Sequence, residues 1–193
     1  IRSCLVGSEM CIRDRHRARV PGLCICLGHQ LWNYAWGAEV IKAKPQREFG
    51  TVLVQAEKIA GELKLFEGVL DENLQLKIQA SHSEAVVSMP QYPGAQLLMR
   101  NEYNAYQAIA FPLDSEQSVV EADNQDALVV SIQNHPEFLI PWMQALMFTR
   151  QDAIRAEGID VDNLCFEDTP HARKIFYNFL QMIIRRSQKR NNK

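Results

Sequence analysis

The sequence predicts a single α/β domain. Its 193 residues, 47% of them hydrophobic, are enough for one sizeable core and have an ordinary globular composition. Strand-like apolar segments occupy most of the chain between residues 20 and 133, and helical periodicity takes over after Glu137. One further helical segment lies near the start of the strands. A series of strands with helices before and after it along the chain is typical of the α/β class.

The first strand and the first helix of this domain meet at a cysteine. Apolar residues over 20–25 run into Cys26, and residues 29–36 have helical spacing of apolar side chains with Gly37 as the stop. Gly28 follows the cysteine at the junction. This is the pattern of a nucleophile elbow, in which a reactive side chain sits on a tight strand-to-helix turn and small neighbours admit the substrate.

The remaining elements follow from alternation, turn residues and caps. Further strands are predicted at 38–43, 50–56, 74–80, 95–99 and 106–111. A polar turn at 123–126 predicts a hairpin between strands 118–122 and 127–133. Helices are predicted at 141–157, with Pro141 in the first turn, and at 170–187, capped by Thr169.

The first residues do not share these patterns. Between Arg13 and Arg19, arginines alternate with other residues and show neither helical nor strand periodicity, and the run 4–15 resembles translated sequencing-adapter read-through. We therefore expect residues 1–19 to be a non-native, artefactual segment. The expected domain covers 20–140, and residues 141–193 form a helical extension that packs on the same domain.

Charge and cysteine content narrow the class of partners. The formal net charge of −2 gives no reason to expect nucleic acid or an anionic membrane as a partner. The basic cluster 185–190 is interpreted as a solvated tail. No run of 18 apolar residues occurs, so no membrane span is predicted. Five irregularly spaced cysteines argue against a disulfide framework and for a reducing, cytoplasmic location.

Three side chains could together perform thiol acyl transfer. A thiol reacts as the thiolate, and a helix N-terminus together with an imidazolium lowers its pKa. Cys26 lies at the predicted helix start, and His135 closes a distant strand. Glu137 follows two residues later, on the same side of an extended chain, where it can orient the imidazole. The backbone N–H of Leu27 is the natural first donor to an oxyanion.

Plainer interpretations exist for each of these residues. Buried cysteines are common, so Cys24 and Cys165 are interpreted as core residues, and Cys26 taken alone would be one too. Cys24 and Cys26 lack a second Cys/His pair at finger spacing, so no metal site is predicted. His82 and Glu84 fit a hydrogen-bonded loop anchor as well as a ligand pair or a base.

The combination of motifs resembles one known family. Cys26-Leu-Gly-His-Gln30 and His135-Pro-Glu-Phe138, in this order and more than a hundred residues apart, resemble the class I glutamine amidotransferases, most closely the stand-alone domains of the GMP-synthase type. Glu48-Phe-Gly50 and the segment 81–86 (Ser-His-Ser-Glu-Ala-Val) look like further family motifs. The resemblance covers about residues 21–138.

This resemblance implies a flavodoxin-like three-layer sandwich with a Cys26–His135–Glu137 triad. The implied reaction is cleavage of the side-chain amide of glutamine through a γ-glutamyl thioester, with release of ammonia and no cofactor. The residues implied to hold the substrate are Gln30, Ser81, His82 and Ser83. A separate synthetase chain is an implied partner that would receive the ammonia.

The sequence departs from the family pattern at three places. Cys24 stands where the elbow usually has glycine, and Glu84 replaces the usual aspartate. The family's opening strands, and the glycine-rich loop that supplies a second oxyanion donor, have no counterpart. We therefore expect an N-terminally truncated domain, and the functional prediction concerns the intact gene product. Two alternatives stay open: a γ-glutamyl peptidase acting on glutathione-like peptides, and an inactive binding or regulatory homologue.

Overall fold

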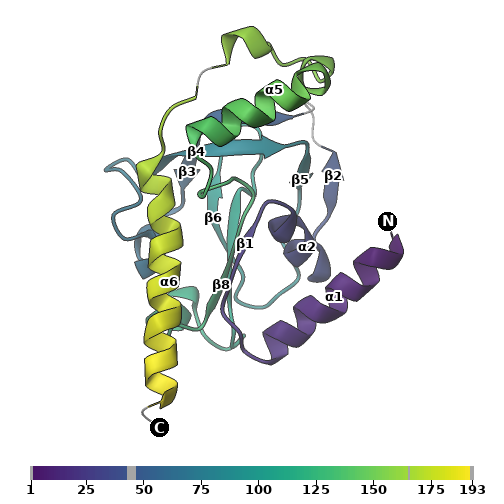
Figure 1. Cartoon of the computed structure of the whole chain (residues 1–193). Coiled ribbons are helices and arrows are strands. Elements are labelled where there is room, and N and C mark those ends of the chain that lie inside the picture. Colours follow the sequence, from purple (N-terminus) through teal and green to yellow (C-terminus); the bar gives the residue numbers. More distant parts are fainter. Residues whose placement is uncertain (1, 43–46, 165, 192–193) are drawn as a thin grey trace.

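The computed structural model describes residues 2–42, 47–164 and 166–191, and it shows a mixed α/β fold around one curled sheet (Figure 1). The strands of this sheet, in spatial order, are β1 (Gly22–Ile25), β8 (Leu128–Ile132), β7 (Ala108–Pro112), β6 (Gln96–Arg100), β3 (Glu48–Ala56) and β4 (Gln75–His82). β1 and β8 run parallel, and the other neighbouring strands run antiparallel. A second small sheet pairs β2 (Val40–Lys42) with β5 (Glu84–Val86).

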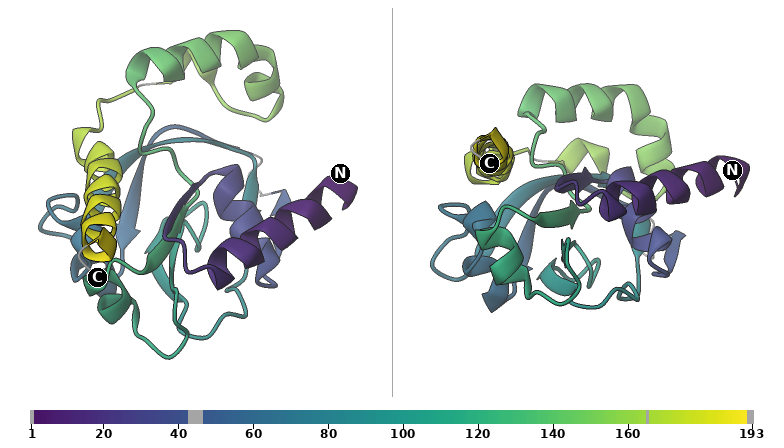
Figure 2. Two further views of the ribbon diagram at one scale, coloured as in Figure 1. Left: turned by 60° about the horizontal axis from the view of Figure 1, so that its bottom comes forward. Right: turned by 90° about the horizontal axis from the view of Figure 1, so that it is seen from below.

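Helices surround this sheet on several sides. They are α1 (Arg2–Arg17), α2 (Leu27–Ala35), α3 (Lys58–Gly61), α4 (Val119–Asn124), α5 (Ile140–Ala156) and α6 (Pro170–Asn191), with short 3₁₀ turns η1 (Lys64–Phe66) and η2 (Val161–Asn163). α1 lies against α2, whereas α6 runs along η1 and β4. Figure 2 shows α5 set apart from both, above the sheet.

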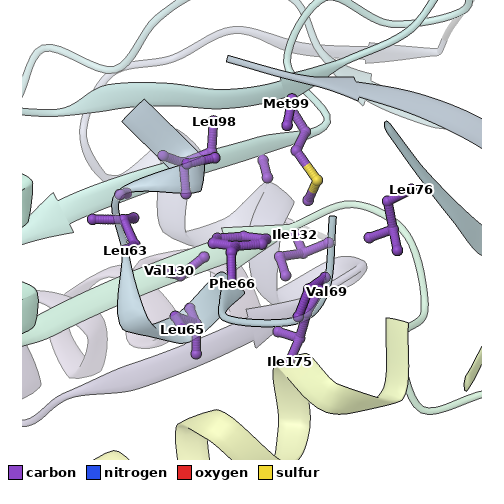
Figure 3. Close-up of a cluster of buried hydrophobic side chains, with 14 of the residues drawn as sticks. Leu63, Leu65, Phe66, Val69, Leu76, Leu98, Met99, Val130, Ile132 and Ile175 are labelled. Carbon is purple, nitrogen blue, oxygen red and sulfur yellow. The ribbon is translucent and has the colours of Figure 1, made fainter. Parts of the chain in front are cut away.

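The two faces of the sheet bury different side chains because successive residues of a strand point in opposite directions. On β8, Val130 and Ile132 point into the larger core, where they meet α4, α6 and η1 (Figure 3). Val129 points to the opposite face and joins a smaller aromatic cluster with Trp32 of α2 and Phe111 of β7. Every residue of β7 and β8 is buried, as expected for strands covered on both faces.

A third cluster fixes α5 over the start of β3. Met143 and Ile154 of α5 pack with Phe49 and Val161, and these residues are buried. At the end of the helix, Glu157 accepts a hydrogen bond from Arg47 at 2.5 Å. α5 begins three residues after Glu137, so this anchoring also holds the segment that carries His135 and Glu137.

Most of the sequence-based elements agree with the structure to within a few residues. The strand predicted at 118–122 is wrong, and so is the hairpin predicted between it and 127–133: Ser118 caps α4, which begins at Val119. Ser118 and Glu121 form a reciprocal capping box at its start, a helix signal that outweighs the apolar run. The short strand β5, the short helix α3 and the 3₁₀ turn η2 were not predicted. α1 occupies part of the segment for which no element was expected, and Cys165 lies outside the described residues.

Candidate active site

Parallel pairing of β1 and β8 brings two distant parts of the chain to one edge of the sheet. Ile25 and Ile132, the last residues of these strands, are direct partners. Cys26 follows Ile25, and its N–H donates to Ile132 O at 2.8 Å. His135 lies three residues beyond Ile132. The carboxyl ends of adjacent parallel strands are a common place for an active site in α/β proteins.

Cys26 occupies a strained turn between β1 and α2. Its φ of 51° and ψ of −107° are unusual for a residue with a side chain and cost about 1–3 kcal/mol. A Cβ added to Gly28 would lie 3.6 Å from Cys24 Cβ, an ordinary van der Waals distance. Leu27 opens α2, and the first N–H groups of a helix lack intrahelical acceptors. The turn therefore places the Cys26 side chain next to the first N–H groups of a helix.

His135 pairs with a carboxylate and lies in the neighbourhood of Cys26. Its Nδ1 donates to Glu137 Oε1 at 2.8 Å, and Cys26 is the other side chain that influences the charge of the ring. Burial alone would lower the pKa of His135, but the hydrogen bonds and charges of Cys26 and Glu137 outweigh it and raise the pKa to about 9. The imidazole is thus protonated at neutral pH, where it favours a thiolate beside it.

An aromatic ring fixes the plane of this imidazole. Phe138 stacks on His135 with ring centroids 3.9 Å apart and an interplanar angle of 10°. Trp142 in turn packs edge-on against Phe138 at 6.0 Å. In the sequence, Phe138 stands out only as the last residue of a motif, and its position directly after the His-Pro-Glu triplet was the available signal.

Cys24 and Cys26, two residues apart, have different surroundings. Burial raises the pKa of Cys24 to about 12, so this thiol is inert, in agreement with its interpretation as a core residue. Cys26 instead faces His135. Among the described residues, no group of three or more His, Cys, Asp or Glu side chains could hold a metal ion.

Gln30, expected to bind substrate, is engaged by the protein itself. Its Nε2 donates to Glu84 O at 3.1 Å and to Gln133 Oε1 at 3.3 Å. Gln133 Nε2 lies 3.9 Å from Cys26 Sγ. Sequence reasoning did not single out Gln133, although it stands two residues before His135 at the end of a buried strand. The substrate role of Gln30 stays a prediction.

Ser81, His82 and Ser83 lie at the end of β4, next to the polar interior of the domain. His82 is buried, with Nε2 2.9 Å from Glu48 Oε2 and Nδ1 3.2 Å from Glu84 O. Ser83 Oγ donates to Glu84 Oε2 at 3.0 Å. Ser81 is half-buried and pairs with Phe49 of β3. Substrate contact by these three residues stays a prediction.

Glu48 is the centre of a buried polar network that the sequence did not reveal. Besides His82, its carboxylate accepts hydrogen bonds from Gln107 at 2.8 Å, from Asn134 at 3.4 Å and from Asn101. Asn134 directly precedes His135. The network therefore joins the ends of β3, β4, β7 and β8 beneath the candidate site.

His29 links α2 to the neighbouring strand β8. Its Nδ1 lies 2.9 Å from Ser131 Oγ of β8, and Asn33 donates to the same hydroxyl at 3.0 Å. Burial lowers the pKa of His29 to about 3, so the ring stays neutral. This contact ties α2 to β8 and so fixes the helix whose N-terminus faces Cys26.

Comparisons with known proteins identify the family of the chain. The family model "Glutamine amidotransferase class-I" matches residues 3–150. One chain of the glutamine-hydrolysing GMP synthase of Sulfurisphaera tokodaii is 34% identical over 124 residues, which cover 63% of this chain and 53% of that protein. The chain thus spans about half the length of this curated relative.

Solved structures show the same fold. A glutamine amidotransferase from Thermotoga maritima matches with a TM-score of 0.65 and 21% identity, over 94% of this chain and 68% of that one. A glutamine amidotransferase from Methylobacillus flagellatus matches with a TM-score of 0.62 and 20% identity, over 90% and 68%. The predicted flavodoxin-like α/β fold is confirmed. With a family model matched over well over half of its residues, this chain belongs to the class I glutamine amidotransferases.

Proposed function

We propose that this chain hydrolyses the side-chain amide of glutamine, with Cys26 as nucleophile, His135 as acid and base, and Glu137 as the group that orients His135. The observation that carries the proposal is the imidazole of His135, which is paired with Glu137 at 2.8 Å and has its pKa raised to about 9 by Cys26 and Glu137 against the effect of burial. A protonated imidazole beside a cysteine at a strained elbow is the arrangement that thiol acyl transfer needs.

The reaction begins with attack of the Cys26 thiolate on the amide carbon of glutamine. As the Sγ–C bond forms, the carbonyl electron pair moves to oxygen, and the N–H of Leu27 donates to that oxyanion. His135 gives its proton to the amide nitrogen, which leaves as ammonia. A γ-glutamyl thioester remains on Cys26.

Water completes the cycle by attacking the thioester carbonyl. The neutral His135 takes one proton from this water, and the hydroxyl adds to carbon. The Sγ–C bond then breaks, its electron pair returns to sulfur, and glutamate leaves. The enzyme is restored with a thiolate and an imidazolium.

The ammonia is proposed to serve a separate synthetase chain. The curated relative is one of the subunits of a glutamine-hydrolysing GMP synthase, which supports a partner chain that consumes ammonia. Across the described residues, none of the helices is long and apolar enough to cross a membrane.

Ammonia release from glutamine tests the proposal. Cys26→Ser is expected to reduce turnover by about 10⁴-fold or more, since removing a nucleophile disables the whole catalytic unit. Cys11→Ser, at an exposed thiol, is the matched control and should keep full activity. A glutamine-analogue electrophile should modify Cys26 in the unsubstituted protein.

Other outcomes would identify the alternatives. Turnover of glutathione without turnover of glutamine would replace the proposal with a γ-glutamyl peptidase. Absence of both activities, together with no covalent adduct at Cys26, would leave a binding or regulatory homologue.

A further inference from the structure

Gln133 is a buried amide beside the nucleophilic sulfur, and the reaction outlined above does not use it. It directly follows β8, and its side chain has no exposed surface. Its backbone N–H donates to Gln107 O at 2.8 Å, which fixes the main chain. From there its Nε2 lies 3.9 Å from Cys26 Sγ, within the range for a hydrogen bond to sulfur.

The hydrogen bonds around Gln133 determine which end of its amide faces the sulfur. Glu84 O is a backbone carbonyl and can only accept, so the group of Gln30 that lies 3.1 Å from it is the NH₂ group. The same NH₂ group lies 3.3 Å from the Gln133 amide and therefore meets its oxygen. The NH₂ group of Gln133 must then point toward Cys26.

We propose that Gln133 is a catalytic residue whose Nε2 donates a hydrogen bond to the Cys26 thiolate, and that Gln30 is the positioning residue that orients this amide. The inference deepens the proposed thiol chemistry and rests on it. It also gives Gln30 a role that needs no direct contact with substrate.

This donor differs in kind from the other groups around the sulfur. The titratable groups near Cys26 are His135, with Glu137 behind it, and the buried Cys24 on β1. His135 loses its proton to the leaving amine during the reaction, whereas the Gln133 amide keeps its protons throughout. Gln133 can therefore stabilise the sulfur whenever it carries charge, and above all when the thioester breaks and the Sγ–C electron pair returns to sulfur.

The pH dependence of Cys26 alkylation by iodoacetamide tests the inference. The rate of alkylation, followed at the Cys26 peptide by mass spectrometry, reports the thiolate fraction. In Gln133→Met the side chain keeps its size and loses its hydrogen-bond donor. The midpoint of the pH profile of alkylation should therefore rise by about one pH unit, which is the effect of losing one hydrogen bond to a charged group. Glutamine turnover should fall about tenfold. Gln125→Met, at an exposed amide, is the control and should leave both unchanged.

A second variant keeps the test decisive if Gln133→Met does not fold. Gln30→Met leaves Gln133 in place and removes the group that orients it, so its midpoint should rise in the same direction by a smaller amount. Unchanged midpoints in the folded variants would overturn the inference. Alkylation does not depend on glutamine hydrolysis. A shifted midpoint of the alkylation profile in a protein without glutaminase activity would therefore contradict the proposed function and leave the inference about Gln133 intact. Glutaminase activity together with unchanged alkylation midpoints in the variants would contradict only the inference about Gln133.

Discussion

Two histidines of this chain bind a glutamate carboxylate at almost the same distance but in different surroundings. His135 Nδ1 lies 2.8 Å from Glu137 Oε1, and His82 Nε2 lies 2.9 Å from Glu48 Oε2. Each histidine also opens a His-x-Glu triplet in the sequence, at 135–137 and at 82–84. An aromatic ring covers each of them, Phe138 in the first case and Tyr103 in the second.

The two pairs differ in the surroundings of the rest of the imidazole ring. In His82 the second ring nitrogen faces the backbone carbonyl of Glu84, and the pair is sealed, with side-chain exposures of 1% for His82 and 7% for Glu48. The ring of His135 instead has the Cys26 thiol as a neighbour that raises its pKa, and the exposures are 12% and 30% for His135 and Glu137. A histidine–carboxylate pair can therefore hold a structure together or move a proton, depending on what else the ring meets.

The largest effect should come from removing the imidazole that faces the thiol. His135→Gln should reduce ammonia release from glutamine by about 10⁴-fold, because it removes the proposed acid and base of the reaction. Thermal unfolding should show that the protein remains folded. His171→Gln, at an exposed histidine, is the control. Retention of more than about a tenth of the activity would contradict a catalytic His135.

Substitutions in the buried pair of His82 and Glu48 should change the stability of the fold. Glu48→Leu leaves His82, Gln107 and Asn134 without their shared acceptor and should lower the free energy of unfolding by about 3–5 kcal/mol. Glu48→Gln keeps one acceptor oxygen and should cost less. Urea unfolding measures both, with the exposed Glu72→Leu as control. A loss below about 1 kcal/mol for Glu48→Leu would mean that the network is not a major support of the fold.

The raised pKa of His135 predicts a pH-dependent contribution to stability. Because its pKa rises from 6.5 to about 9 on folding, the contribution is complete below pH 6.5 and is lost as the pH rises through 9. It amounts to about 3 kcal/mol. Urea unfolding of the unsubstituted protein and of His135→Gln should differ most at the acid end of this range. A constant difference across it would contradict the shift.

The smallest effect should come from the ring stacked on His135. Phe138→Leu should lower turnover by about five- to tenfold, because a stacked aromatic pair contributes about 1 kcal/mol. Phe138→Tyr keeps the stack and should restore most of the rate. Phe148→Leu, at a side chain that is 73% exposed on α5, should have no effect. Equal turnover in Phe138→Leu and Phe148→Leu would show that the stack does not hold the imidazole.

The sequence was sufficient for the elements whose signals are local. The strand-to-helix junction at Cys26 and the helices starting near Pro141 and Pro170 follow from spacing and caps, and the structure has them within a few residues. The strand predicted at 118–122 failed because its apolar run masked the Ser118–Glu121 cap.

The polar contacts around the site could not be read in this way. The network of Glu48 and the amide of Gln133 unite residues from separate strands. Their partners are set by sheet order and register, and local pattern carries neither. Two His-x-Glu triplets therefore look alike in the sequence, while only the packed structure shows which histidine has a thiol among the groups that set its charge.

The parallel pairing of β1 and β8 has a consequence for how the chain folds. Within the described residues β1 pairs with β8 alone, and Gln133 meets Cys26 across 107 positions of sequence. During synthesis β1 emerges long before the strand that receives it, and contacts of such long range form slowly. The elbow therefore stays without its partner strand until β8 has also been synthesised. Reactivity at Cys26 should be among the last native properties to appear on refolding, which makes it a sensitive reporter of complete assembly.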